Sequence, residues 1–137
     1  RPYVKTNLRV YSDSTLTDSY DGLSVISGVG NVSNKYLCFL GGDHPIATID
    51  TDTDGPVCIL IKESYGNAFA PWLTSHYSKI IVIDPREFNR DGKPSLDLTT
   101  FAKEQGIDDL IVINYPYMIN NASYVSWLNR LVGNTTE

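Results

Sequence analysis

Hydrophobic positions along this chain change their spacing near residue 55. Up to that point, short apolar or alternating runs are broken by Ser, Thr, Asn, Asp and Gly, which is typical of short strands and irregular loops. From Pro56 onward, apolar runs of strand length alternate with stretches of helical spacing. This order predicts a single α/β domain, with an irregular β-rich part at residues 1–55 and β-α-β repeats at residues 56–133. Such repeats favour a parallel sheet flanked by helices, with right-handed crossovers.

The same pattern predicts where individual elements lie. Strands are expected at 8–11, 23–26, 36–40, 46–49, 57–61, 80–83 and 110–113, and helices at about 67–77, 96–105 and 122–132. Ser95 or Asp97 is a plausible N-cap for the second helix, and Gly106 is placed to end it. In the last helix, apolar residues recur every three or four positions and form one stripe, which is most simply core. These residues are Tyr124, Trp127, Leu128 and Leu131.

Size and charge narrow the classes of function. The chain has 137 residues, of which 42% are hydrophobic and 20% charged, enough for one core that needs no metal or disulfide. A net charge of −5 with 11 scattered basic residues argues against a nucleic-acid partner. The longest apolar runs, 57–61 and 79–83, are strand-sized, so no membrane span is expected. Because the chain opens with Arg1-Pro2 and has no signal-peptide character, we expect a further segment upstream.

Cofactors and metals are not expected. Cys38 and Cys58 both lie in apolar stretches and are interpreted as free, buried thiols. Residues 50–55 resemble the first half of an EF-hand loop, but the twelfth position, which requires a glutamate, is Ile61. A solvated acidic turn is therefore favoured over a calcium site. No Gly-rich phosphate loop follows any predicted strand, which disfavours a nucleotide-binding domain of flavodoxin type.

Ser64 is the best candidate for a nucleophile. It ends an apolar run and starts a stretch of helical spacing, so it is expected at the carboxyl end of a buried strand. Open α/β sheets bind ligands at that edge, and the first helical amides behind such a serine can bind an oxyanion. Gly66 would let this turn approach a neighbouring strand closely. The structural alternative is that Ser64 or Asn67 only caps the helix.

A serine needs a base, and the chain offers few. His44 lies in a turn-like sequence with Asp43, but adjacent side chains point in different directions, so a direct relay between the two is awkward. A hairpin turn is the favoured interpretation of this segment, which leaves His44 a possible but disfavoured base. His76 lies near a helix end, where a protonated ring would complement the helix dipole.

Polar residues also follow the two later strands. Arg86 could bind an anion or oxyanion, and Asn114 could donate a hydrogen bond to one. If the three strands are parallel, both residues share an edge of the sheet with Ser64, and Asn67 is a further candidate for contacting substrate there. The alternatives are an ion pair of Arg86 with Asp84 or a neighbouring glutamate, and a turn role for Asn114.

Two blocks of the chain resemble the carboxyl-terminal half of bacterial DHHW proteins. These blocks are Ile61-Lys62-Glu63-Ser64-Tyr65-Gly66-Asn67-Ala68-Phe69-Ala70-Pro71-Trp72-Leu73, and His76 to Ile80 followed by Val82-Ile83-Asp84-Pro85-Arg86. That family is related to the alginate O-acetyltransferase-like proteins of SGNH type, and the likeness covers roughly residues 36–132. It implies a flavodoxin-like SGNH hydrolase fold, an exported location, acyl-ester chemistry on cell-surface carbohydrate, and Ser64 as nucleophile.

Two features depart from the family pattern. Glu63 stands where the family usually has aspartate, and the Asp-His-His-Trp motif thought to supply the base and its orienting acid is absent. The resemblance places that motif upstream of Arg1. We therefore expect an SGNH-like serine esterase or O-acyltransferase that is incomplete in this chain and acts on a glycan or acyl ester. The alternative is a non-catalytic carbohydrate-binding or surface-assembly module, in which tyrosines could stack on sugars.

Overall fold

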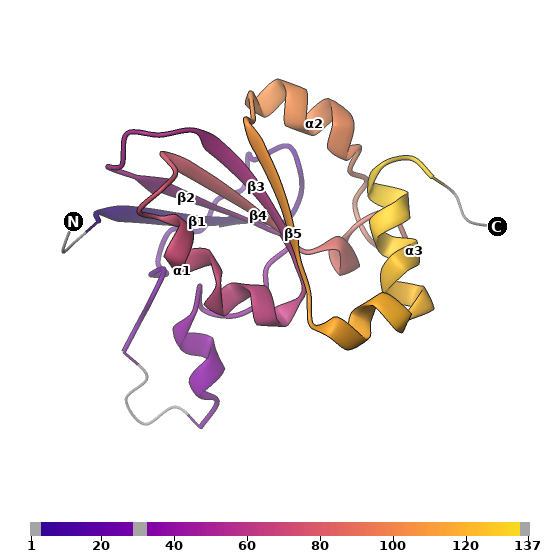
Figure 1. Ribbon diagram of the computed structural model, residues 1–137, viewed down its shortest axis with the longest axis horizontal. Coiled ribbons are helices and arrows are strands. Elements are labelled where there is room, and N and C mark those ends of the chain that lie inside the picture. The colour runs from indigo at the N-terminus through magenta and orange to yellow at the C-terminus, as the bar shows by residue number, and fades with distance from the viewer. Residues whose placement is uncertain (1–3, 29–32, 135–137) are drawn as a thin grey trace.

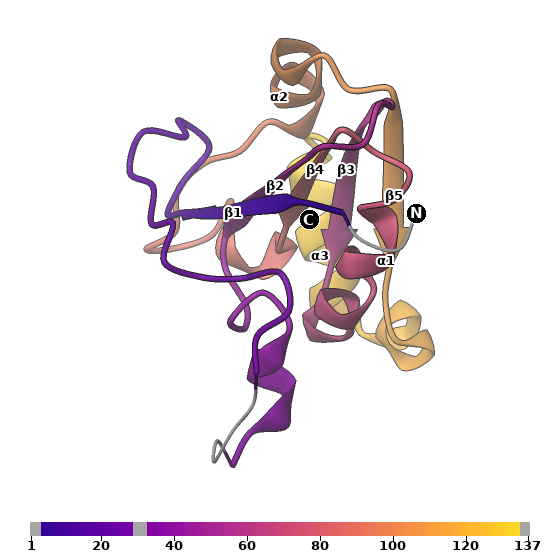
Figure 2. The ribbon, with the colours of Figure 1, turned by 90° about the vertical axis from the view of Figure 1, so that its left-hand side faces the viewer.

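The structure of the protein, a computed structural model, describes residues 4–28 and 33–134 around a central five-stranded sheet. The strand order is β1-β2-β4-β3-β5, which Figure 2 shows from one edge to the other. The strands are β1 (Thr6–Tyr11), β2 (Ile46–Thr51), β3 (Val57–Lys62), β4 (Lys79–Ile83) and β5 (Asp109–Ile113). The predicted α/β class is therefore confirmed, as are the strands expected at 8–11, 46–49, 57–61, 80–83 and 110–113.

The sheet is mixed, not fully parallel. β3 runs parallel to both of its neighbours, β4 and β5, as the β-α-β pattern predicts. β2, however, is antiparallel to both β1 and β4. The reason is the short connection from β2 to β3, residues 52–56, because a parallel crossover needs a dozen or more residues.

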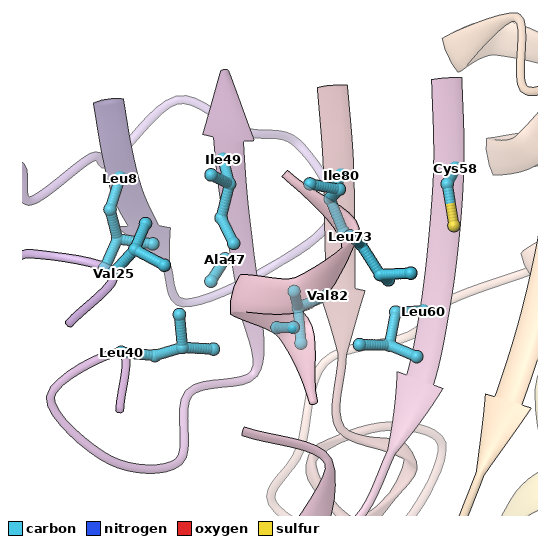
Figure 3. Close-up of a cluster of buried hydrophobic side chains, with 11 residues drawn as sticks. Leu8, Val25, Leu40, Ala47, Ile49, Cys58, Leu60, Leu73, Ile80 and Val82 are labelled. Carbon is cyan, nitrogen blue, oxygen red and sulfur yellow. The ribbon is translucent and has the colours of Figure 1, made fainter. Parts of the chain in front are cut away.

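Helices cover both faces of the sheet (Figure 1). They are α1 (Ala70–Leu73), α2 (Leu98–Gln105) and α3 (Ala122–Leu131), with four 3-10 helices: η1 (Lys35–Cys38), η2 (Ser64–Ala68), η3 (Pro85–Glu87) and η4 (Pro116–Asn120). Because side chains alternate along a strand, β3 feeds two cores. Leu60 packs on the face that carries Leu73 of α1, as Figure 3 shows. Ile61 packs on the opposite face, with Phe101 of α2 and Leu131 of α3.

Local signals set the ends of α2 as expected. Asp97 is the N-cap, since its side chain accepts hydrogen bonds from the backbone N–H groups of Thr99 and Thr100. Gly106 ends the helix in the left-handed conformation, with φ of 62°.

The apolar stripe predicted for α3 packs inward, since Tyr124 and Leu131 are buried.

Three element predictions are wrong. Residues 36–40 are not a strand: Tyr36 to Cys38 belong to η1, because the Asn34 side chain accepts from Tyr36 N–H and starts a tight turn. Residues 23–26 contribute only a single bridge, from Ile26 to Phe39. The helix expected at about 67–77 is split into η2 and α1 and ends at Leu73.

The structure also shows where the two cysteines and the acidic run 50–55 lie. Both cysteines are free, and burial raises the pKa of the Cys58 thiol to about 11. Asp50, the first residue of the acidic run, lies in β2 and pairs with Lys79 at 3.6 Å. Within residues 4–28 and 33–134, no group of three or more His, Cys, Asp and Glu side chains could hold a metal ion. No helix in this part of the chain is long and apolar enough to cross a membrane.

Candidate functional site

The carboxyl ends of β3, β4 and β5 lie at one edge of the sheet, as the parallel pairing requires. The chain leaves β3 through α1 on one face and leaves β4 towards α2 on the other, so these neighbouring strands form a topological switch point. Ser64 follows β3, and Asp84 and Arg86 follow β4. Because β2 is antiparallel to β4, with Ile46 opposite Ile83, the loop before β2 reaches the same edge and brings Asp43 to it.

Ser64 is the first residue of η2 and its hydroxyl faces other side chains, not the backbone. Its Oγ donates to Asp43 Oδ2 at 2.6 Å and accepts from Arg86 Nη2 at 3.2 Å. The helix is capped by Glu63, whose Oε2 accepts from Tyr65 N–H at 3.0 Å. Neither Ser64 nor Asn67 therefore acts as the cap, and the serine hydroxyl remains available for chemistry.

Ser64 is half-buried and lines a cavity of about 480 Å³. The other lining residues are Asn34, Tyr36, Tyr65 and Ala68. The hydroxyl group of Tyr36 is buried and interacts with Asn67. Burial, together with the charges of Asp43 and Glu63, raises the pKa of Tyr36 above its ordinary value although hydrogen bonding with Asn67 opposes the rise, so this phenol stays neutral.

Asp43 is the hub of the site. Its Oδ1 accepts from Lys62 Nζ at 2.9 Å and from Asn67 Nδ2 at 2.8 Å, and its Oδ2 accepts from Arg86 Nη2 at 2.8 Å. Burial alone would raise the pKa of Asp43, but the hydrogen bonds from Ser64, Lys62 and Arg86 hold it well below its usual range. Asp43 is therefore a carboxylate at any physiological pH.

Asp84 is the second carboxylate that pairs with Lys62 and Arg86. The side chains of Lys62 and Asp84 are each only 1% exposed, and they lie 3.6 Å apart. Arg86 Nε donates to Asp84 Oδ1 at 2.9 Å, and Arg86 Nη2 lies 2.5 Å from Oδ2. The hydrogen bond to Asp84 raises the pKa of Arg86, with burial opposing it. Two cations and two carboxylates thus form a compact network, which satisfies the requirement that buried charges be paired.

Close backbone packing holds the turn of Ser64 against β3. A Cβ atom on Gly66 would lie 2.3 Å from Lys62 Cβ and 3.2 Å from Ile113 Cγ2. Only glycine leaves room for this approach, which is the role that the sequence suggests for it.

The other predicted site residues lie apart from the Ser64 hydroxyl. His44 Nε2 is 2.8 Å from the Leu40 carbonyl oxygen, and its ring lines a different cavity. His76 is exposed beyond the end of α1. Asn114 lies at the expected edge, after β5, but its Nδ2 donates to Tyr115 O at 3.1 Å. Neither histidine makes a hydrogen bond to Ser64, so the described residues offer this serine no imidazole base.

The sequence analysis missed Asp43 as the partner of Ser64, and it missed Lys62 and Tyr36. The sequence does contain one signal for the contact between Lys62 and Asp43. Lys62 directly follows the apolar run 57–61, and a lysine that continues a buried strand requires a carboxylate nearby. Which carboxylate this is depends on the long-range placement of the loop before β2, which spacing does not reveal. For Tyr36 we find no signal, since the segment around it was interpreted as a strand.

Comparisons with solved structures agree with this architecture. A DHHW family protein from Eubacterium siraeum matches with a TM-score of 0.67 at 22% identity, over 98% of this chain and 41% of that protein. The chain has the fold of a DHHW family protein. Bacillus cereus PatB1 with a sulfonyl adduct matches with a TM-score of 0.59 at 16% identity, over 79% of this chain and 35% of PatB1. A second PatB1 structure matches with a TM-score of 0.58.

These similarities concern the fold. They confirm the resemblance to DHHW proteins at that level, together with the α/β class of the fold. No protein-family model and no curated protein sequence matches the chain. The chain spans about two fifths of the length of the DHHW structure and about a third of PatB1.

Proposed function

We propose that this chain carries the nucleophile of an SGNH-type serine esterase or O-acyltransferase that acts on cell-surface carbohydrate outside the cytoplasm. The observation that carries the proposal is the placement of the Ser64 hydroxyl. It stands at the switch point between β3 and β4, borders a cavity, and is oriented by Asp43 and Arg86. The fold that the chain shares with PatB1, a protein that was solved with a sulfonyl adduct, supports the proposal. The carbohydrate substrate and the exported location rest on the family resemblance.

In this mechanism, Ser64 Oγ attacks the carbonyl carbon of an acyl ester. Its proton passes to a base, the ester bond breaks, and the alcohol leaves with a proton while the acyl group stays on Ser64. Water or a sugar hydroxyl then attacks the acyl-serine, which releases an acid or a new ester. An esterase and a transferase differ only in which of these two acceptors enters the cavity.

The base must be a group other than Asp43. The pKa of Asp43 is depressed by its hydrogen bonds, and a base with a pKa far below the working pH accepts a proton poorly. Asp43 instead fixes the direction of the Ser64 hydroxyl. We infer that the histidine base comes from residues outside this chain, which agrees with the greater length of the DHHW structure and of PatB1. The chain alone is then expected to be nearly inert.

Arg86 is the group beside Ser64 that can stabilise the oxyanion. Its Nη2 lies 3.2 Å from Ser64 Oγ and remains charged. Tyr36 lines the same cavity, but its hydroxyl is buried and interacts with Asn67. Donors already in place before the reaction are the usual source of transition-state stabilisation in acyl transfer. Asn67 contributes indirectly, because its Nδ2 is bound to Asp43.

A non-catalytic carbohydrate-binding or surface-assembly module is the second candidate. It is favoured by one specific observation, the row of exposed tyrosines next to Ser64, which needs no base to bind a ligand. In that case the charged network would serve stability alone.

Covalent labelling separates the two candidates. The intact protein is treated with an aryl sulfonyl fluoride, which transfers its sulfonyl group to an activated serine and releases fluoride, and the peptide that carries the adduct is found by mass spectrometry. We expect the adduct on Ser64, its loss in Ser64→Ala, and its retention in Ser75→Ala, a matched exposed serine beyond α1. An intact protein that cleaves esters equally well after Ser64→Ala would contradict the proposal. Glycan binding without any adduct would favour the module.

A further inference from the structure

Three tyrosine rings lie in a row beside the proposed nucleophile. Tyr65 and Tyr115 are stacked, with ring centroids 5.1 Å apart and an interplanar angle of 17°. Tyr117 continues the row at 5.4 Å from Tyr115, tilted by 34°. Tyr65 directly follows Ser64 in the chain and lines the same cavity. The row therefore starts at the reactive cavity and leads away from it.

The rings remain accessible although they touch one another. Tyr65, Tyr115 and Tyr117 are 66%, 42% and 73% exposed. Large aromatic side chains gain most from burial, so a contiguous exposed group of them usually marks a binding surface. Tyr124, by contrast, is 1% exposed and serves the core, which is the ordinary role of a tyrosine.

Glu63 holds the first two rings in register. It is 5% exposed, and its two carboxylate oxygens accept from two backbone N–H groups: Oε2 from Tyr65 at 3.0 Å and Oε1 from Tyr115 at 2.9 Å. One buried carboxylate thus ties the loop after β3 to the loop after β5. Charge-assisted hydrogen bonds of this kind are stronger than neutral ones, so the row is a built feature of the sheet edge.

The chemistry of the row points to a neutral, ring-shaped ligand. Flat apolar faces with a hydroxyl at the rim suit a pyranose ring, whose C–H face packs on an aromatic ring while its hydroxyl groups exchange hydrogen bonds. A polyanion is disfavoured by the net charge of −5. We propose that Tyr65, Tyr115 and Tyr117 form a sugar-binding platform that guides a neutral glycan to Ser64. This proposal rests on the proposed function, because it assumes that Ser64 attacks an ester carried by a carbohydrate.

Titration of the chain with neutral hexasaccharides tests the platform without requiring catalysis. Cellohexaose and chitohexaose are titrated up to millimolar concentration by isothermal calorimetry. Stacking on one aromatic ring is worth roughly a tenfold change in affinity, by analogy with bases stacked on aromatic side chains. We expect Tyr117→Ala and Tyr65→Ala each to weaken binding of at least one hexasaccharide about tenfold. Tyr20→Ala is the matched control, since Tyr20 is 59% exposed and lines a different cavity, and it is expected to bind as the unaltered chain does.

Three other results would decide against the platform. It is overturned if neither hexasaccharide binds, or if Tyr20→Ala weakens binding as much as Tyr117→Ala. It is also overturned if light scattering shows that Tyr117→Ala disrupts self-association, because the row would then be a contact between copies of the chain. Tyrosine-dependent binding in a protein whose Ser64 resists sulfonylation supports the platform while it contradicts the proposed catalysis. The failure of one proposal is therefore distinguishable from the failure of the other.

Discussion

The two parts of the chain supply the site in different ways. In residues 56–134, the buried strands β3 and β4 run parallel, and each is followed within three residues by a polar group of the site, Ser64 after β3 and Arg86 after β4. In residues 4–28 and 33–55, the structure is mostly irregular, yet this part contributes Asp43, the residue that contacts both of those groups. The regular part fixes where the chemistry occurs, whereas a loop of the irregular part sets its electrostatics. Loops held by a rigid scaffold commonly have this role.

The largest expected effect comes from removing the contribution of the irregular part. Asp43→Ala leaves Lys62 and Arg86 with Asp84 as their remaining acidic partner. The Asp43 side chain is 35% exposed, but its partner Lys62 is only 1% exposed, so the cost lies between that of a surface pair and that of a buried one. We expect a loss of roughly 2–3 kcal/mol in the free energy of unfolding, measured by urea denaturation. The matched control is Asp50→Ala, whose partner Lys79 is half-exposed, with an expected loss below about 1 kcal/mol. Equal losses in the two variants would show that Asp43 is no more than a surface charge.

The next effect tests the regular part. In Gly66→Ala, the new methyl group meets Lys62 Cβ at 2.3 Å, so η2 must move away from β3. Overpacking of this kind costs about 2 kcal/mol, and we expect sulfonylation of Ser64 in the intact protein to slow as its hydroxyl leaves Asp43. Gly28→Ala is the control, because no atom of the described residues lies within 4 Å of its added Cβ. If Gly66→Ala unfolds like the unaltered chain, the turn is not held by close packing.

The smallest expected effect is a pH dependence of the free energy of unfolding, caused by the contacts of Asp43 with the regular part. The pKa of Asp43 is depressed in the folded chain by Ser64, Lys62 and Arg86, so the stability that it contributes is present above its unfolded value of 3.8. Below that pH the unfolded chain takes up a proton that the folded chain does not, and the contribution declines. Denaturation curves from pH 7 down to pH 3 should therefore show the unaltered chain losing its advantage over Asp43→Asn below about pH 4. A constant difference across this range would mean that Asp43 carries no such linkage.

The sequence predicts the regular part well for a physical reason. Runs such as 57–61 and 80–83 are buried on both faces, so their apolar composition follows directly from their place in the sheet. The caps of α2 were also predictable, because Asp97 and Gly106 act through local backbone contacts. Ser64 could be singled out because it lies between such a run and a stretch of helical spacing.

The rest depends on contacts that are distant along the chain. The stretch 36–40 has strand-like composition, but a local cap at Asn34 places its first three residues in a 3-10 helix. The antiparallel direction of β2 follows from the short loop to β3, and it decides which edge of the sheet Asp43 reaches. Hydrophobic spacing predicts neither the order of the strands in the sheet nor the partner of a buried lysine. The network of Asp43, Lys62, Asp84 and Arg86 could therefore not be predicted from it.

The reversed direction of β2 has a consequence for how such a site can diverge. The turn of Ser64 leaves the end of one strand, and the loop with Asp43 enters the start of another, two positions away in the sheet. Insertions in surface loops cost little free energy, so the segment before β2 can lengthen without shifting the register of β3. Descendants of this architecture can thus exchange the acid beside the serine, and with it the charge that an incoming ligand meets, while the turn that presents the hydroxyl is inherited intact.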